Sequence, residues 1–167
     1  MSNSSDDAPQ DDVPVTDTHL RRYIGYRMKR AYVHLHNDAQ AAIEGFGLRI
    51  TTSSALHVIV ENPNLSQSQL CLALNIERSR AVLLVDELEK LGLVTRNKVP
   101  QDRRSYALRA TPAGHALLDD VAACLGAHED TVLAALTPAE KAQLATLLDK
   151  VERSAVLARA MGADGGG

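Results

Sequence analysis

The feature that most constrains the fold is a short non-helical stretch in a chain that otherwise shows helical periodicity. The segment RNKVPQDRRSYALRAT at residues 96–111 places a polar Pro-Gln-Asp turn between two runs that contain β-branched and aromatic residues. Such runs, joined by a polar turn, predict a β-hairpin. Tyr106, Leu108 and Ala110 fall on one face of its second arm, because side chains alternate along a strand. The chain must therefore combine helices with one small β-ribbon.

Apolar residues recur at helical spacing before this hairpin. They predict a long amphipathic helix over about 19–44, which the glycines at 45–47 end. A second helix is expected to start with Thr51 or Thr52 as its cap and to run to about Glu61, shortly before a proline.

Two short helices separated by a tight turn come directly before the hairpin. Ser66 and Gln69 have the spacing of a capping box, which starts a helix through the segment LCLAL. The turn falls at 75–76, and the next helix is expected to run from about Arg78 to Leu91 and to end at Gly92. Its buried stripe is expected to contain Ala81, Leu84, Val85, Leu88 and Leu91.

Two further helices follow the hairpin. The pairs Thr111-Pro112 and Thr137-Pro138 are typical helix starts, and the expected spans are about 112–135 and 138–160. Two short helices, a turn and a hairpin in this order predict a winged helix-turn-helix over about 50–111. The fold class is therefore expected to be mainly α (α+β), with long helices on both sides of the winged module.

Composition agrees with a globular protein. The chain has 167 residues, of which 45% are hydrophobic and 23% charged, so one domain over 19–160 is expected. The polar segments 1–18 and 161–167 are expected to be disordered tails. No apolar run approaches the roughly 20 residues of a membrane span, and the acidic N-terminus is unlike a secretory signal, which favours a cytoplasmic location.

Charge is strongly segregated although the net charge is only −3. Residues 1–18 carry five aspartates and no Lys or Arg, whereas residues 19–32 carry five basic residues and no acidic one. Residues 77–111 hold eight basic and five acidic residues. A near-neutral mean therefore does not exclude nucleic-acid binding, which depends on whether the positive charge lies on one face.

In a winged helix-turn-helix, the second helix of the pair enters the DNA major groove. Basic residues at the tip of the hairpin are then placed to reach the narrow minor groove, where guanidinium groups are attracted. Candidates for DNA contact are Ser66, Gln67 and Ser68 for phosphate, Arg78, Ser79 and Arg80 for base edges, Lys98 for phosphate, and Asp102, Arg103 and Arg104 at the tip. Asp102 is expected to hold a neighbouring arginine, and the alternative for every basic residue is a solvated surface charge.

The motifs around the hairpin resemble the MarR family of transcriptional regulators. The resemblance rests on ELEKLGLVTR (87–96) and PQDRRSYALRATPAGHALL (100–118), and it covers about 19–160. The matching residues are Leu88, Glu89, Gly92, Leu93, Val94, Arg96, Asp102, Arg104, Thr111 and Gly114. Ala110 departs from the leucine that the family often has before this threonine.

The resemblance implies a homodimer that binds a pseudo-palindromic operator in double-stranded DNA, most often as a repressor. The dimerisation helices would lie at about 19–46 and 112–160. The sequence supports this independently, because the terminal helices carry more apolar positions than one winged module can bury.

Family members typically release DNA when a small aromatic acid enters the cleft between the dimer helices and the winged module. The segment RRYIGYRMKRAYVHLH resembles regulators that respond to hydroxycinnamoyl-CoA thioesters, although a solvated or DNA-facing basic patch is the alternative. Candidate ligand residues are Arg22, Tyr26, Arg30, His34, Arg49 and His57. No permanent cofactor is expected.

Other classes of function have less support. Cys71 and Cys124 form no CxxC pair and are expected to be buried structural thiols, while a thiol-based redox sensor or a ligand-independent DNA-binding protein remains an alternative. His34 and His36 lie about 200° apart on a helix, so they do not chelate one metal together. No phosphate-binding loop, nucleophile elbow or paired carboxylate motif indicates an enzyme.

Overall fold

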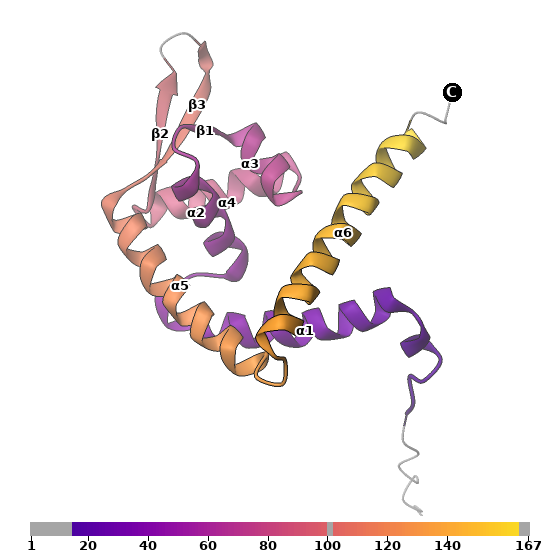
Figure 1. Cartoon of the computed structure of the whole chain (residues 1–167). Coiled ribbons are helices and arrows are strands. Elements are labelled where there is room, and N and C mark those ends of the chain that lie inside the picture. The colour runs from indigo at the N-terminus through magenta and orange to yellow at the C-terminus, as the bar shows by residue number, and fades with distance from the viewer. Residues whose placement is uncertain (1–14, 100–101, 164–167) are drawn as a thin grey trace, which may run out of the picture. The chain divides into compact units, whose positions relative to one another are not determined.

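The computed structural model describes residues 15–99 and 102–163. The chain divides into two compact units after His34, and residues 15–34 belong to the first of them. The helices are α1 (Ile24–Ile43), α2 (Ile50–Glu61), α3 (Gln67–Leu74), α4 (Arg78–Lys90), α5 (Pro112–Val132) and α6 (Pro138–Ala163), as Figure 1 shows. The strands are β1 (Leu65–Ser66), β2 (Val94–Val99) and β3 (Asp102–Ala110), and short 3-10 turns lie at Leu20–Arg22 and Glu44–Phe46.

The three strands form one antiparallel sheet in the order β1-β3-β2. Val94 pairs with Ala110 and Arg96 with Leu108, which confirms the predicted hairpin, and the ladder shifts register between Lys98 and Val99. Strand β1 was not predicted, because two residues are too few to show a period. The fold is thus mainly helical with a small three-stranded wing, as the sequence predicts.

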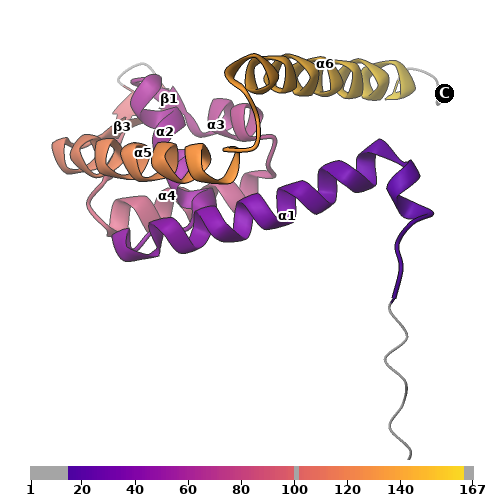
Figure 2. The same cartoon turned by 60° about the horizontal axis from the view of Figure 1, so that its bottom comes forward.

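The core lies where α2, α4, α5 and the base of the hairpin meet. Leu56, Leu88, Leu108 and Val121 are fully buried there. Helix α2 lies beside both α4 and α5, as Figure 1 and Figure 2 show. The winged module is therefore packed directly against the first of the two C-terminal helices.

The predicted buried stripe of α4 is confirmed at four positions and wrong at the fifth. Ala81, Leu84, Val85 and Leu88 are buried, but Leu91 is 50% exposed. Leu91 lies just past the last residue of the helix, and the chain then turns at Gly92, whose φ is +72°. The turn carries Leu93 into the core instead.

The predicted cap of α2 is wrong. The helix begins at Ile50, so Thr51 and Thr52 lie inside its first turn, and Thr52 is buried. The amide of Ile50 donates instead to Oε1 of Gln40, at 2.9 Å. The side chain of Gln40, ten residues upstream, therefore caps the first amide of α2, and no local sequence pattern indicates this contact.

The N-terminal helix is less continuous than predicted. The 3-10 turn at Leu20–Arg22 ends at Tyr23, which is extended, before α1 begins at Ile24. Asp17 accepts hydrogen bonds from Arg21 Nε at 2.6 Å and from the Tyr26 hydroxyl at 2.9 Å. Both hydrogen bonds hold the pKa of Asp17 below its usual value, and the bond from Arg21 has the larger effect. Residues 15–18 of the acidic segment are thus part of the described structure, whereas residues 1–14 and 164–167 lie outside it.

The other predicted helix starts are confirmed. Ser66 and Gln69 form the complete capping box of α3. Thr137 and Glu140 form the same box at α6. The turn between α3 and α4 is made by Asn75, whose φ is +50°. The capping box fixes where α3 begins, and the turn at Asn75 fixes where α3 ends before α4.

Candidate nucleic-acid interface and ligand cleft

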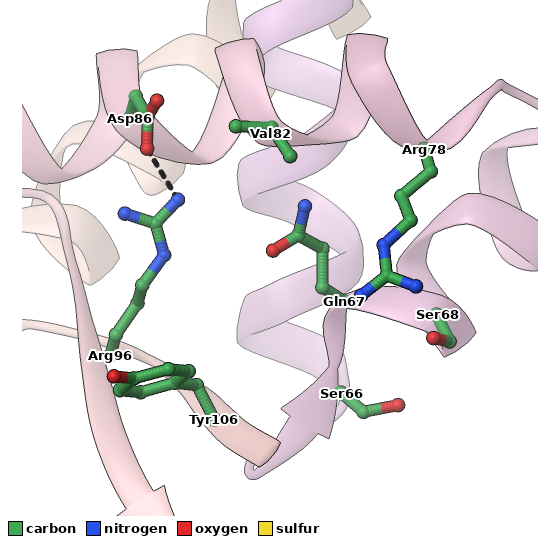
Figure 3. A pocket seen from close by; sticks show the side chains of 8 residues that line it. All are labelled: Ser66, Gln67, Ser68, Arg78, Val82, Asp86, Arg96 and Tyr106. Atoms are coloured by element: carbon green, nitrogen blue, oxygen red, sulfur yellow. Dashed lines mark hydrogen bonds and ion pairs between the residues drawn. The ribbon is translucent and has the colours of Figure 1, made fainter. Parts of the chain in front are cut away.

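A cavity of about 500 Å³ lies between α3, α4 and the hairpin. Figure 3 shows its lining, which comprises Ser66, Gln67 and Ser68 at the start of α3, Arg78, Val82 and Asp86 on α4, and Arg96 and Tyr106 on the strands. Four of the residues that the sequence predicts for DNA contact are thus brought to one hollow. Val82, Asp86 and Tyr106 were not predicted to take part.

Residues of the first turn of α3 line this cavity, and the first amides of any helix have no partner within the helix. Ser66 and Gln69 satisfy each other through the capping box, so the flanking side chains Gln67 and Ser68 remain available. Gln67 Nε2 is buried and has no hydrogen-bond partner among the described residues. Helix N-termini of this kind attract phosphate oxygens.

The predicted base readers lie in the first turn of α4 and are all exposed. Arg78 lines the cavity, whereas Ser79 and Arg80 do not. At 100° per residue, Ser79 falls on the outermost face of the helix, and Arg80 falls on the side away from the cavity. The three residues therefore cover the whole solvent-facing width of the helix start.

Arg96 on β2 bridges the hairpin and α4. Its guanidinium donates to Asp86 and to Glu89, each at 2.5 Å. The two carboxylates lie one turn apart on the exposed side of α4, so the one guanidinium pairs with both and offsets part of their combined charge. Sequence reasoning singled out Arg96 only as part of a family motif, because its partners are seven and ten residues away.

The tip of the hairpin is described only in part. Lys98 is exposed on β2 and pairs in register with Tyr106, and it does not line the cavity. Asp102 begins β3 and pairs with Val99. The side chains of Asp102, Arg103 and Arg104 lie outside the described residues, so the contact predicted between Asp102 and an arginine stays a prediction.

Two further hollows border α2 and α5. The first, of about 360 Å³, is lined by Ile50, Ser53, Ser54, His57, Val58, Leu74 and Leu125. The second, of about 330 Å³, is lined by Leu35, Ala39, Ile50, Leu125, His128, Glu129 and Leu133. The two share Ile50 and Leu125, and we call them together the α2–α5 cleft.

The α2–α5 cleft is apolar with a few polar atoms. Ser53 Oγ and His128 Nε2 are buried and have no hydrogen-bond partner among the described residues. His57 Nδ1 donates to the carbonyl of Ser53 at 3.0 Å, which leaves Nε2 of the neutral ring as an acceptor. Buried polar atoms are costly when unpaired, so these atoms favour a ligand that supplies hydrogen bonds.

The predicted ligand residues are only partly found at this cleft. His57 lines it, whereas Arg49 precedes α2 and forms an ion pair with Glu87 on α4. The other four predicted ligand residues belong to the separate N-terminal unit and are Arg22, Tyr26, Arg30 and His34. Ser53 and His128 were missed, because nothing in their local sequence distinguishes them from other buried polar residues.

The remaining predictions concern thiols, metals and membranes. Cys71 and Cys124 are both only partly buried, and Cys124 Sγ donates to the carbonyl of Ala42 at 3.2 Å. Across residues 15–99 and 102–163, no three His, Cys, Asp or Glu side chains gather as a metal site requires. Within the same residues, every helix is too short or too polar to cross a membrane.

Two helices joined by a tight turn, with a three-stranded wing behind them, define a winged helix-turn-helix DNA-binding protein. A model of the MarR family matches residues 46–105. The chain is 36% identical over 128 residues to a Thauera aromatica protein assigned as a regulator of the hcr operon, covering 72% of this chain and 77% of that protein.

Solved structures agree with this match. The transcriptional repressor CouR bound to a 23-mer DNA duplex aligns with a TM-score of 0.79 and 28% identity, over 83% of this chain and 98% of that one. CouR from Rhodococcus jostii bound to p-coumaroyl-CoA aligns with a TM-score of 0.72 and 26% identity, over 79% and 93% of the two chains. This chain therefore belongs to the MarR family and is a DNA-binding transcriptional regulator, not an enzyme.

Proposed function

We propose that this protein is a repressor that leaves a pseudo-palindromic operator when an aromatic carboxylate or its CoA thioester binds. The observation that carries the proposal is the α2–α5 cleft, an apolar hollow with unpartnered polar atoms beside the DNA-binding helices. A repressor of similar fold binds a DNA duplex in one structure and p-coumaroyl-CoA in another.

The grip on DNA follows from the order of the elements. Helix α4 enters the major groove with Arg78, Ser79 and Arg80 toward the bases, and the start of α3 holds phosphate. The hairpin reaches the adjacent minor groove through Arg103 and Arg104, with Asp102 orienting an arginine and Lys98 on phosphate. Arginine is suited to both places, because its fork bonds guanine in the major groove and its charge favours the narrow minor groove.

A homodimer is the second part of the proposal, with dimerisation segments at about 19–46 and 112–160. Helix α6 supports it, because its apolar side chains are exposed in the single chain. These are Leu144, Leu147, Leu148, Val151, Val156 and Leu157. A two-fold symmetric dimer has two DNA-binding modules, which explains why the operators of such dimers are pseudo-palindromic.

Ligand binding changes the grip through α2. Helix α2 forms one wall of the cleft and packs against α4 on its other side. A ligand that fits a displaced position of α2 better than the DNA-bound one shifts the population toward the displaced state. The aromatic ring would lie against Ile50 and Leu125, and its polar group would meet Ser53 or His128.

The test is release of a fluorescent duplex from the DNA upstream of the regulator's own gene. We expect p-coumaroyl-CoA or p-coumarate to raise the apparent Kd for DNA, and CoA alone to have no effect. The variant Ala39→Leu places a larger side chain in the cleft and should keep DNA binding but lose release. Ala41→Leu, at an exposed position of the same helix, is the matched control.

Unchanged DNA affinity with every aromatic ligand would contradict the effector part of the proposal. Release by peroxide that alkylation of Cys71 prevents would replace it with thiol sensing. Failure to bind any duplex would contradict the grip itself.

A further inference from the structure

The exposed face of α4 has two apolar residues at its centre, and packing within the single chain does not explain why they are apolar. Val82 is 37% exposed and Leu83 is 68% exposed, while the same helix already buries Ala81, Leu84, Val85 and Leu88 in the core. The helix therefore has a complete buried stripe without these two residues. Two neighbouring apolar side chains remain in solvent on the helix that the proposed function places in the major groove.

Val82 and Leu83 are the middle of a continuous strip. With Ser79 and Asp86 they occupy positions i, i+3, i+4 and i+7, which lie on one side of a helix. Figure 3 shows Val82 directed into the cavity between Arg78 and Asp86. The apolar centre is thus continuous with the cavity that holds the phosphate and base candidates.

The chemistry of the strip limits which groups on a base edge its central residues can bind. Asp86 could otherwise accept a hydrogen bond from cytosine, but its Oδ1 is held by Arg96. Val82 and Leu83 have no hydrogen-bonding atoms in their side chains. In the major groove, the apolar group on a base edge is the C5 methyl of thymine.

We infer that Val82 and Leu83 form a thymine-reading patch, which contacts the C5 methyl groups of thymine in the centre of each operator half-site. This inference rests on the proposed function, because it needs α4 in the major groove. A DNA duplex as the occupant is supported by Arg78 on one side of the patch and the N-terminus of α3 in the same cavity, while the Asp86 carboxylate is paired with Arg96. Arg78 and the start of α3 contact the duplex beside the patch, and the patch favours base pairs whose thymine methyl group lies against it.

The experiment first selects a high-affinity duplex from a random pool with the full-length protein. Each thymine of the selected site is then replaced by deoxyuridine, which removes the methyl group and leaves every hydrogen-bonding atom. We expect one or two positions per half-site at which the substitution weakens binding about fourfold, the change that corresponds to about 0.8 kcal/mol for one buried methyl-sized group. In Leu83→Ala or Val82→Ala, the same substitution should no longer matter.

The matched control is Leu72→Ala, which removes the same side chain from α3, where Leu72 is 81% exposed. This variant should distinguish thymine from deoxyuridine as the wild type does. Because Leu83 and Leu72 are largely exposed, both variants are expected to fold.

Three results would overturn the inference. Deoxyuridine could be neutral at every position while the protein binds the selected duplex tightly, in which case the proposed function stands. Leu83→Ala could weaken binding to thymine and deoxyuridine duplexes equally. Leu83→Ala or Val82→Ala could lower the oligomeric state of the protein without changing its affinity for DNA, in which case a second copy of the chain covers the patch. If no duplex is enriched at all, the proposed function fails, and the inference fails with it.

Discussion

Gly114 lies directly against the backbone of Leu93, since a Cβ atom at Gly114 would stand 2.2 Å from the carbonyl oxygen of Leu93. Thr111 reinforces this junction, because its amide donates to the same oxygen at 2.9 Å and its hydroxyl donates to the Gly92 carbonyl at 2.8 Å. The Thr-x-x-Gly motif therefore joins the first turn of α5 to the base of the hairpin.

Replacement of Gly114 by alanine should destabilise the protein, because the methyl group meets backbone that cannot rotate away. We expect the free energy of unfolding in urea to fall by about 1–3 kcal/mol or more, the usual cost of overpacking. Gly126→Ala is the control in the same helix, where a Cβ meets nothing within 4 Å. It should be neutral or stabilise by up to about 1 kcal/mol. Equal effects of the two variants would contradict the close contact.

Arg96→Met should weaken DNA binding about tenfold, which corresponds to about 1.4 kcal/mol. The variant leaves the carboxylates of Asp86 and Glu89 without their cationic partner on the face that we propose meets DNA. Arg49→Met removes a comparable ion pair, with Glu87, from a residue that does not line the cavity, and should have a smaller effect. Fluorescence anisotropy at several salt concentrations measures both.

The double variant Arg96→Met with Asp86→Asn separates two roles of Arg96. If Arg96 acts by neutralising Asp86, the second substitution should restore part of the lost affinity. An affinity as low as that of the single variant would indicate that Arg96 contacts DNA itself.

Val151→Glu should convert the proposed dimer into monomers. Val151 lies with Leu144, Leu147 and Leu148 on one apolar side of α6, and a carboxylate buried there in each subunit has no partner. We expect the dimer dissociation constant to rise on the order of a hundredfold or more. Thr146→Glu adds the same charge on the opposite side of α6, and this variant should keep the molar mass of the dimer in solution. Light scattering after size-exclusion chromatography distinguishes the two outcomes.

The start of α6 should become pH-dependent in the acid range through Glu140. Hydrogen bonds from the Thr137 amide and hydroxyl hold the pKa of Glu140 below its ordinary 4.5. A lowered pKa in the folded state gives stability that is present above pH 4.5 and is lost as the pH falls through the folded-state value. Glu140→Gln keeps the capping box without a titrating group.

The measurement compares urea midpoints of the wild type and Glu140→Gln between neutral pH and about pH 2, below the reference carboxyl pKa values. The wild type should lose its advantage only below pH 4.5. Parallel curves for the two proteins would show that the capping carboxylate contributes nothing.

The sequence predicted those features whose cause lies within a few residues. The capping boxes at Ser66 and Thr137, the turn at Asn75 and the helix end at Gly92 each depend on neighbours in the chain. The hairpin followed from alternation and a polar turn, and the winged fold followed from the order of these elements. Short-range geometry of this kind is written in local residue types.

Only the tertiary structure decided the contacts between distant segments. It showed that Gln40 caps α2, that Arg96 joins both acidic residues of α4, and that Leu91 is exposed although it has core spacing. It also placed Ser53 of α2 and His128 of α5 in neighbouring hollows that share Ile50 and Leu125, which no spacing could indicate. Local signals fix where a helix begins and ends, whereas the packing of whole elements decides which side chains meet, because that packing depends on contacts summed over the entire core.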